Sequence, residues 1–386
     1  MRAVFGLSHM SAGFVAVLVG YSSSAAIIFQ AAAAAGATQA EIGSWLWALG
    51  VGMGATCIGL SLRYRSPVLT AWSTPGAALL VTGLAGIPMS EAIGAFMFCS
   101  ALILLCGVTG WFETIMRHVP GALAAGMLGG VLLRFGLDLF VSATTEPLLV
   151  VAMLASYLLV RHRWPRYVIP LALLVGLGLS GAQGLLHFGD FQWQLARPVP
   201  VLPSFSIATL VGVGIPLFVV TMASQNVPGI AVLRAHGYQT PASPLIGWTG
   251  LTGILLAPFG GFAFNLAAIS AAVCMGREAD PDPLKRYRAT VWGGIFYLLM
   301  GVFGATVVGL FAALPTELVM AIAGLALLGT IGNSLGVALK DEGDRDAALL
   351  TFMITASGVT LMGVGSAFWG LVVGLLVHVL NRRRAV

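Results

Sequence analysis

The stretch Arg65–Gly83, RSPVLTAWSTPGAALLVTG, lies inside strongly apolar sequence but does not suit a continuous membrane-spanning helix. Pro67 and Pro75 each remove a backbone donor and disfavour helix at the residue before them. The short piece between the two prolines tolerates extended structure. Ser73 or Thr74 can then cap a new helix with Pro75 at its first position. The stretch therefore predicts an extended segment that enters the membrane, followed by a half-helix that begins near mid-depth.

A broken helix of this kind has functional consequences. Irregular backbone at membrane depth is tolerated only where it is buried in protein or lines a cavity. The free N–H groups and the positive dipole end of a half-helix suit an anion. The alternative interpretation of this stretch alone is a proline-kinked helix that binds no ligand.

The composition is that of a membrane protein. The chain has 386 residues, 58% of them hydrophobic and 9% charged, and a mean hydropathy of +0.96. A soluble protein averages about a quarter charged residues, and about 20 apolar residues cross the hydrocarbon core. We therefore predict an all-α integral membrane protein with fourteen transmembrane segments. The four cysteines fall in apolar stretches, so we expect reduced packing residues without disulfides or a metal site.

The placement of the basic residues supports this span count. With a cytoplasmic N-terminus, fourteen spans put 17 of the 19 Lys and Arg residues on the cytoplasmic side. The exceptions are Arg134, inside the fifth span, and Arg197, in a long outer loop at 187–204 that we expect to link two halves. This asymmetry follows the positive-inside rule. It predicts a bacterial inner-membrane protein with both termini cytoplasmic, and it explains the net charge of +5 without a nucleic-acid partner.

An internal repeat relates the two halves. When the sequence is shifted by 195 residues, Val119–Arg134 lies on Leu314–Gly329 with five identities, among them Pro120 on Pro315. The same shift places the broken third span on the short tenth span, within residues 258–276. Seven spans is an odd number, so the second half must be inverted in the membrane. Inverted repeats with a discontinuous helix at matching places indicate a secondary transporter with its site at the repeat interface.

The tenth span follows the logic of the third. Two glycines and Phe262–Phe264 form an extended lead-in, after which Asn265 can cap a helix over Leu266–Met275. Two half-helix N-termini facing each other near mid-membrane would make an anion pocket without a formal positive charge.

Polar residues deep in spans one and eight are further candidates. Span one carries Tyr21-Ser22-Ser23-Ser24 and Gln30, and span eight carries Ser224-Gln225-Asn226 before Pro228 and Gly229. Such residues either bond neighbouring helices together or line a cavity. For the serines we favour a role in holding neighbouring helices together, with a partial contribution to the lining of the pocket. For residues 224–226 we favour a functional role, because three polar residues before Pro-Gly predict an interrupted helix.

Buried ionisable residues are scarce. Arg134 and Asp138 are four residues apart in span five and can pair on one helix face. The pair is either a proton relay or a neutralised structural pair, and we favour the latter. The sequence contains no nucleophile–base pair, metal cluster or phosphate-cradling loop. We therefore predict no enzyme activity, no catalytic residues, no cofactor and no metal.

Four segments, GYSSSAAIIFQAA, PVLTAWSTPGAALLVTG, TMASQNVPGIAVLRAHGY and GVGSAFWGL, resemble the benzoate transporter (BenE) family. The resemblance covers essentially the whole chain. It implies the seven-plus-seven inverted-repeat fold of nucleobase/ascorbate transporters, with short extended segments and half-helices in spans three and ten. It also implies a core domain at residues 1–115 and 205–313 and a gate domain at 116–204 and 314–386. Family members are associated with proton-coupled uptake of benzoate-like acids, and relatives of this fold are often homodimers.

The chain departs from nucleobase transporters of this fold, which place carboxylates in spans eight and ten. Here those spans offer Ser224, Gln225, Asn226 and Asn265. The difference fits an anionic substrate, which a buried carboxylate would repel. It leaves the proton carrier open: the substrate brings its own proton, or the Arg134–Asp138 pair titrates.

Together these observations predict a secondary transporter of a small aromatic carboxylate, driven by protons through movement of core against gate. We expect the carboxylate to contact Thr74 or the Gly76 N–H, together with Asn265. The expected remaining lining is Ser23, Ser24, Gln30, Ser224, Gln225 and Asn226. The residues that flank the ring in this hypothesis, each equally consistent with packing, are Tyr21, Trp72, Phe262 and Phe264. The alternatives are a carrier for another anion or a nucleobase-like weak acid, an anion channel of the same fold, and a receptor or scaffold.

Overall fold

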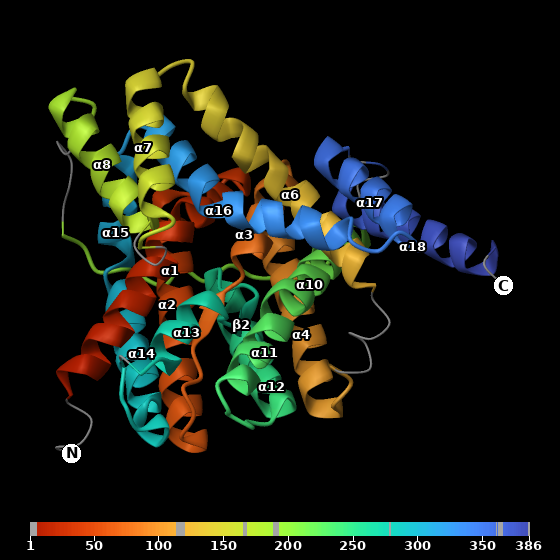
Figure 1. Cartoon of the computed structure of the whole chain (residues 1–386), viewed down its shortest axis with the longest axis horizontal. Helices are drawn as coiled ribbons and strands as arrows, with labels where there is room; N and C mark the ends of the chain where they lie inside the picture. The colour runs from red at the N-terminus through yellow and green to blue at the C-terminus, as the bar shows by residue number, and fades with distance from the viewer. Residues whose placement is uncertain are drawn as a thin grey trace.

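The computed structural model describes residues 6–112, 120–164, 168–187, 193–277, 279–359, 361 and 366–384. Nearly all of this chain is helical, and one two-stranded sheet lies at its centre (Figure 1). The predicted boundary between residues 115 and 116 lies outside the described residues.

The first half contains a broken segment flanked by helices. Its elements are α1 (Leu7–Ala34), α2 (Gln39–Tyr64), β1 (Thr70–Trp72), α3 (Thr74–Gly83), α4 (Met89–Thr109), α6 (Gly121–Ser142), α7 (Pro147–Val160) and α8 (Val168–Ala182). Helix α2 begins with a capping box formed by Thr38 and Glu41. It ends where Arg65 adopts a left-handed conformation, two residues before Pro67.

The second half begins with one long helical run that contains two π-helical turns. This run comprises α9 (Ile207–Thr209), η2 (Leu210–Gly214), α10 (Ile215–Thr221), η3 (Met222–Asn226) and α11 (Val227–Ala235). The elements after it are α12 (Ala242–Leu256), η4 (Ala257–Phe259), β2 (Phe264–Leu266), α13 (Ile269–Met275), η5 (Pro283–Lys285), α14 (Tyr287–Val302), α15 (Gly304–Ala312), α16 (Thr316–Ala338), α17 (Arg345–Ser357) and α18 (Ser366–Arg384).

The extended segments and half-helices predicted for spans three and ten are confirmed by β1 with α3 and by β2 with α13. The helix predicted over Leu266–Met275 begins later, at Ile269, because the preceding residues form a strand. The start points keep the spacing of the sequence repeat: α3 and α13 begin at Thr74 and Ile269, 195 positions apart.

In the part of the chain that the structure describes, six helices are long and apolar enough to cross a membrane. A seventh candidate is α14 with α15, which the prediction treated as one span but which bend by 70° at Phe303. Shorter apolar helices, such as α7 and α8, occupy other predicted spans. The chain is therefore a multi-pass helical membrane protein, and the count of fourteen spans and their inverted arrangement stay predictions.

The helices pack in two groups. Around the sheet, α2 packs against α14, α4 against α12, and α1 against α3, α13 and α14. In the upper part of Figure 1, α6 packs against α16 and α17, α7 against α8, and α17 against α18. Both α3 and η3 contact α6, so the half-helix of span three lies where the two groups meet.

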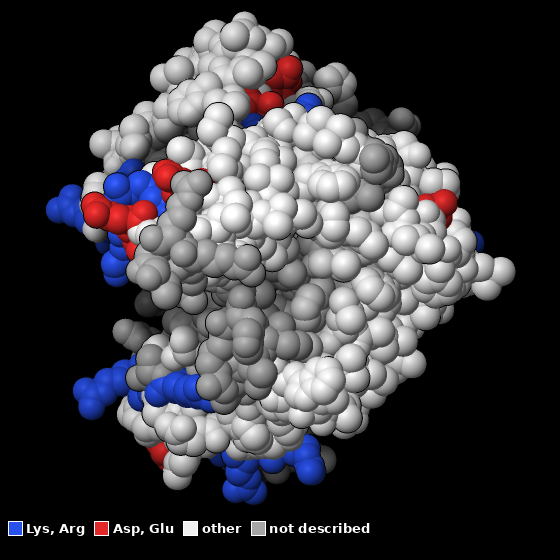
Figure 2. Space-filling view, turned by 90° about the vertical axis from the view of Figure 1, so that its right-hand side faces the viewer, with Lys and Arg blue, Asp and Glu red and all other residues white. Residues whose placement is uncertain are grey.

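Charged side chains lie mainly at the margins of the molecule. The face in Figure 2 has a broad uncharged surface, with Lys, Arg, Asp and Glu gathered at its edges. A surface of this kind suits contact with lipid tails, where charged groups are costly.

Candidate functional site

Two short strands pair at the centre of the molecule, and we call the paired residues 70–72 and 264–266 the crossing. β1 and β2 run antiparallel, with Thr70 opposite Leu266, Ala71 opposite Asn265 and Trp72 opposite Phe264. A further bond from the Ala267 N–H to the Leu69 carbonyl, at 2.9 Å, extends the pairing. The pairing satisfies backbone groups that the helix breaks would otherwise leave bare in the membrane.

Helix α3 starts from this crossing with Ser73 as its cap. The Ser73 hydroxyl oxygen accepts the Gly76 N–H at 3.0 Å, and Thr74 is the first helical residue, followed by Pro75. This settles the choice between Ser73 and Thr74 that the sequence left open. The Gly76 N–H therefore has a partner already. The Thr74 hydroxyl is half-buried and has no hydrogen-bond partner within the described residues.

Asn265 does not cap the second half-helix, and that prediction is wrong. It lies within β2, and its amide nitrogen donates to the Ala263 carbonyl at 3.0 Å. The cap position of α13 is taken by Ala268, which makes no side-chain bond. Asn265 is a strand residue and not a helix cap because it pairs with Ala71 across the sheet. Its amide oxygen is buried and has no partner, so it remains an acceptor at the crossing.

The polar run of span eight lies in the π-helical turn η3. The helix itself continues unbroken over Ile207–Arg234, so the predicted interruption is a local π-turn and not a break. π-turns inside helices are frequent at functional sites. The Asn226 side-chain oxygen accepts the Leu266 N–H at 3.0 Å, and its nitrogen donates to the Met222 sulfur at 3.1 Å. Ser224 donates to the Val220 carbonyl of its own helix. Gln225 is half-buried and has no partner among the described residues.

Trp72 links the crossing to span one. Its ring N–H donates to the Ser24 hydroxyl at 2.8 Å, and Ser24 donates in turn to the Gly20 carbonyl at 2.7 Å. The Tyr21 ring packs edge-on against Trp72 with centroids 4.7 Å apart. Ser24 is therefore a helix-bonding residue at the edge of the site. The Ser23 side chain lies outside the described residues, as does that of Ser22.

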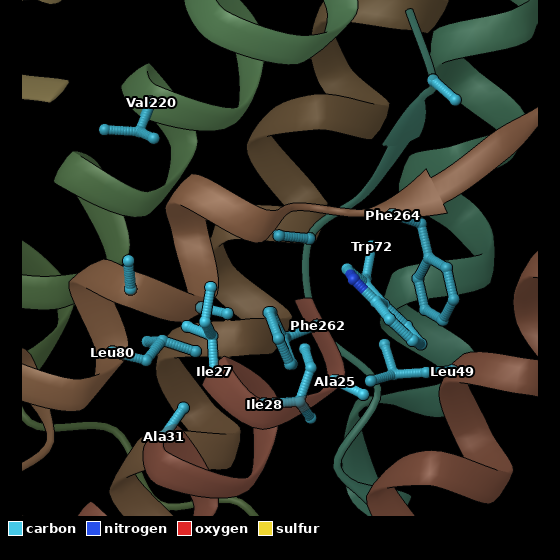
Figure 3. Close-up of a cluster of buried hydrophobic side chains, with 14 of the residues drawn as sticks. Ala25, Ile27, Ile28, Ala31, Leu49, Trp72, Leu80, Val220, Phe262 and Phe264 are labelled. Atoms are coloured by element: carbon cyan, nitrogen blue, oxygen red, sulfur yellow. The ribbon is translucent and has the colours of Figure 1, made fainter. Parts of the chain in front are cut away.

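The other predicted ring contacts and Gln30 are packed in this structure. Figure 3 shows Trp72 and Phe264 next to each other, with Phe262 nearby. Phe262 and Phe264 are fully buried, and Phe262 also packs against Trp45 and Phe96. Gln30 donates to the Met320 sulfur at 3.4 Å, in α16, away from the strands.

Arg134 and Asp138 lie on α6 but do not pair. Arg134 is exposed, Asp138 is half-buried, and no ion pair joins them in the described part of the chain. The predicted neutralised pair is therefore wrong for this structure. A spacing of four residues permits such a pair on a helix but does not enforce it.

Two further groups lie at the centre, and of these only Thr70 is not among the polar residues that the sequence points to. The Thr221 hydroxyl, one turn before Gln225, is buried without a partner. Thr70 anchors β1 to α2 through its hydroxyl contact with Thr56 at 2.6 Å and through its N–H, which donates to the Cys57 sulfur at 3.1 Å. Threonine and cysteine in apolar helices carry no sequence signal that separates these roles from simple packing.

The described part of this arrangement offers polar groups suited to binding a ligand. Among the described residues at or beside the crossing, the groups without partners include the Tyr21, Thr74 and Thr221 hydroxyls, the Gln225 amide and the Asn265 amide oxygen. They lie close to an aromatic cluster. Such a set can hold a small, flat, polar ligand, because sites of this kind pair an apolar wall with a few directed polar groups.

Comparison with known proteins agrees with this description. Residues 3–380 match the family model "Benzoate membrane transport protein" (BenE). The chain is 52% identical over 368 residues to "Inner membrane protein YdcO" of Escherichia coli (strain K12), covering 95% of this chain and 94% of that protein. It is 41% identical over 378 residues to the "Benzoate membrane transport protein" of Acinetobacter baylyi, covering 98% and 96%.

Solved structures share the fold at low sequence identity. The transmembrane domain of the cyanobacterial bicarbonate transporter BicA matches with a TM-score of 0.59 and 12% identity, covering 96% of this chain and 97% of that one. SLC26A9 matches with a TM-score of 0.57 and 14% identity, covering 96% of this chain and 65% of that one. The fold is thus that of the SLC26 and BicA transporters, and the chain belongs to the benzoate membrane transport protein (BenE) family.

Proposed function

We propose that this protein is a secondary active transporter of a small aromatic carboxylate of the benzoate type. The observation that carries the proposal is the buried crossing of β1 and β2, from which α3 and α13 begin, in a chain of the benzoate transport family. Discontinuous helices near mid-membrane are where many secondary transporters bind substrate. The names of the two relatives support the substrate class and an inner-membrane location.

The unpartnered groups suggest how the carboxylate is held. The Thr74 hydroxyl and the Gln225 amide donate to its oxygens, and Tyr21 and Trp72 lie against the ring. The Gly76 N–H plays no direct part, because Ser73 already accepts it. Asn226 acts by holding β2 in place, since its amide is bonded to Leu266 and fully buried.

Proton symport fits a substrate that carries its own proton. The Asn265 amide oxygen is a buried acceptor without a partner, and a protonated carboxylic acid offers it an O–H donor. No Asp or Glu lies in β1, α3, β2 or α13. The alternative proton carrier is the Arg134–Asp138 pair. It has no structural support, because Arg134 is exposed and forms no ion pair with Asp138 in the described residues.

The proposed movement is an elevator-type shift of the group around the sheet against the group of α6–α8 and α16–α18. Support comes from α3 and η3, which both meet α6 at the boundary of the groups. Both termini are proposed to be cytoplasmic, since this orientation places 17 of 19 basic residues inside. A homodimer remains the expected assembly by resemblance to the fold.

The substrate class is tested by competition. Initial uptake of radiolabelled benzoate into cells that express the protein is measured with excess unlabelled benzoate, a ring-substituted benzoate, acetate, bicarbonate or uracil. We expect only the two aromatic carboxylates to compete. Competition by uracil or bicarbonate alone would support the carrier of another solute, and uptake that does not saturate would support a channel.

The site is tested in the same assay with Thr74→Ala. Loss of a hydrogen bond to a neutral acid costs about 0.5–1.5 kcal/mol, so KM should rise about two- to tenfold. Thr82→Ala is the matched control, because the Thr82 hydroxyl bonds only the Leu79 carbonyl of the same helix. Equal kinetics for the Thr74 variant and the wild type would remove Thr74 from the site.

A further inference from the structure

The segment 193–204, which we name the outer strap, is fixed across the ends of several helices around the sheet. Residues 193–206 form neither helix nor strand. Five backbone N–H groups of the strap are bonded to those helices and to η4: Gln194 to the Thr306 hydroxyl at 3.0 Å, Ala196 to the Val302 carbonyl at 2.8 Å, Val199 to the Ser44 hydroxyl at 2.9 Å, Val201 to the Pro258 carbonyl at 2.8 Å and Ser204 to the Ser90 carbonyl at 2.9 Å. The strap is therefore a built part of this face rather than a loose linker.

Arg197 lies on the strap between two of these anchors, Ala196 and Val199, so its backbone position is defined. Its side chain is exposed and has no partner among the described residues. It lines a cavity of about 1010 Å³ between the strap, the start of α2 and α15. The other lining residues include Gln39, Gly43, Leu195, Ala305 and Val308.

The charges around this cavity make Arg197 distinctive. By the predicted topology, this face carries Glu41, Glu91, Glu146, Asp190 and Glu317, and Arg197 is the only Lys or Arg in its loops. Glu41 is the acid closest in sequence to the cavity lining. It is occupied as a cap, because its carboxylate accepts the Thr38 N–H at 2.7 Å and the Thr38 hydroxyl at 2.8 Å. An anion that approaches this face thus meets an unpaired guanidinium in a hollow beside apolar side chains.

We propose that this cavity is a second, low-affinity binding site that captures small aromatic carboxylates on the outer face before they reach the crossing. The guanidinium binds the carboxylate in a two-pronged contact, and the alkyl walls from Leu195, Ala305 and Val308 receive the ring. The ligand class rests on the proposed function, whereas the anion site itself rests on Arg197 and the cavity. An exposed charge pair is weak and screened by salt, so binding in about the millimolar range is expected.

The test uses a cysteine as a reporter of occupancy. The native cysteines are all buried, so Gln39→Cys places a single accessible thiol in the cavity lining without changing the apolar walls. Intact cells are treated with a cationic, membrane-impermeant thiosulfonate, with and without about 10 mM benzoate. The same variant is combined with Arg197→Gln, or with Lys340→Gln as a control. Lys340 lines a different cavity, of about 650 Å³, with Asp341, Glu342 and Asp344.

We expect benzoate to slow labelling at least threefold, with protection lost in Arg197→Gln, kept in Lys340→Gln and reduced in 0.5 M salt. Equal labelling rates with and without benzoate would overturn the proposal. So would protection that persists in Arg197→Gln, or protection by short-chain phosphatidylglycerol in detergent but not by benzoate, which would assign the cavity to a lipid headgroup. Labelling needs no transport. Protection without uptake would therefore contradict only the proposed function, and uptake without protection only this site.

Discussion

The side-chain oxygen of Asn226 accepts the backbone N–H of Leu266 at 3.0 Å and so joins the π-helical turn of span eight to the strand β2. The amide of Asn226 is fully buried. It therefore sets the position of the crossing and does not reach a ligand in this structure. The contact explains why a polar run at this depth is needed: only a side chain can satisfy the Leu266 N–H here.

Asn226→Ala should impair both stability and transport. The variant leaves the Leu266 N–H buried without a partner, which costs about 1–3 kcal/mol. We expect a lower melting temperature in detergent and a strongly reduced uptake rate. Ser224→Ala is the control, because Ser224 bonds only within its own helix. Wild-type melting and uptake for Asn226→Ala would show that the contact does not support the site.

Gly229→Ala should displace β2 from span eight. A Cβ at Gly229 would lie 2.6 Å from the Leu266 Cβ and 3.0 Å from its carbonyl oxygen, both too close without movement. We expect uptake to fall about tenfold or more although alanine favours helix by about 1 kcal/mol. Gly329→Ala in α16 is matched, since nothing lies within 4 Å of its added Cβ. If both variants transport equally well, the close approach of Gly229 to Leu266 is not needed for transport.

Asp280→Asn should loosen the far end of α13. The Asp280 carboxylate bonds His9 of α1 at 2.8 Å, and Arg286 ties the Asp280 and Met275 carbonyls together, each at 2.8 Å. Burial raises the pKa of Asp280, but the Asp282 N–H, the His9 ring and Lys285 lower it more, so the pKa lies below its ordinary value of 3.8. A carboxyl with a lowered pKa stabilises the fold above that ordinary value and loses this contribution as pH falls through the folded value.

The variant should therefore melt about 2–4 °C below the wild type at pH 7, and this difference should shrink as the pH falls below 3.8. Melting curves in detergent at three pH values measure this. A difference at pH 7 that stays the same below pH 3.8, or no difference at pH 7, would contradict the assignment.

The sequence predicted the backbone plan of the site well, because prolines and glycines carry direct information about where a helix cannot continue. Pro67 and Pro75 placed β1 and α3, whereas the Ser-Gln-Asn run before Pro228 marks a π-turn inside an unbroken helix. These are local rules, and the tertiary structure did not override them.

What failed depended on contacts between distant segments. Asn265 has the right residue type for a helix cap, but its pairing with Ala71, 194 positions earlier in the chain, makes it a strand residue. Asn226 was expected to line the pocket, and only its bond to Leu266 shows that it is a positioning residue. Arg134 and Asp138 have the spacing of a pair, yet no ion pair joins them in the described chain.

The outer strap is a third feature that the sequence predicted only in part. Its prolines and polar residues predicted a loop between halves, and the described residues indeed lack regular structure. No sequence pattern indicates that successive N–H groups of this loop bond to α2, α14, α15 and η4. The unpaired state of Arg197 is likewise visible only in three dimensions.

The central claim is tested most directly by radiolabelled benzoate uptake into proteoliposomes of purified protein, with and without an inward proton gradient. Empty liposomes are the control, because benzoic acid crosses membranes unaided. We predict saturable accumulation above the control that increases with the gradient and falls with Thr74→Ala. Uptake equal to that of empty liposomes, or protein-dependent uptake indifferent to the gradient, would contradict a proton-coupled aromatic carboxylate transporter.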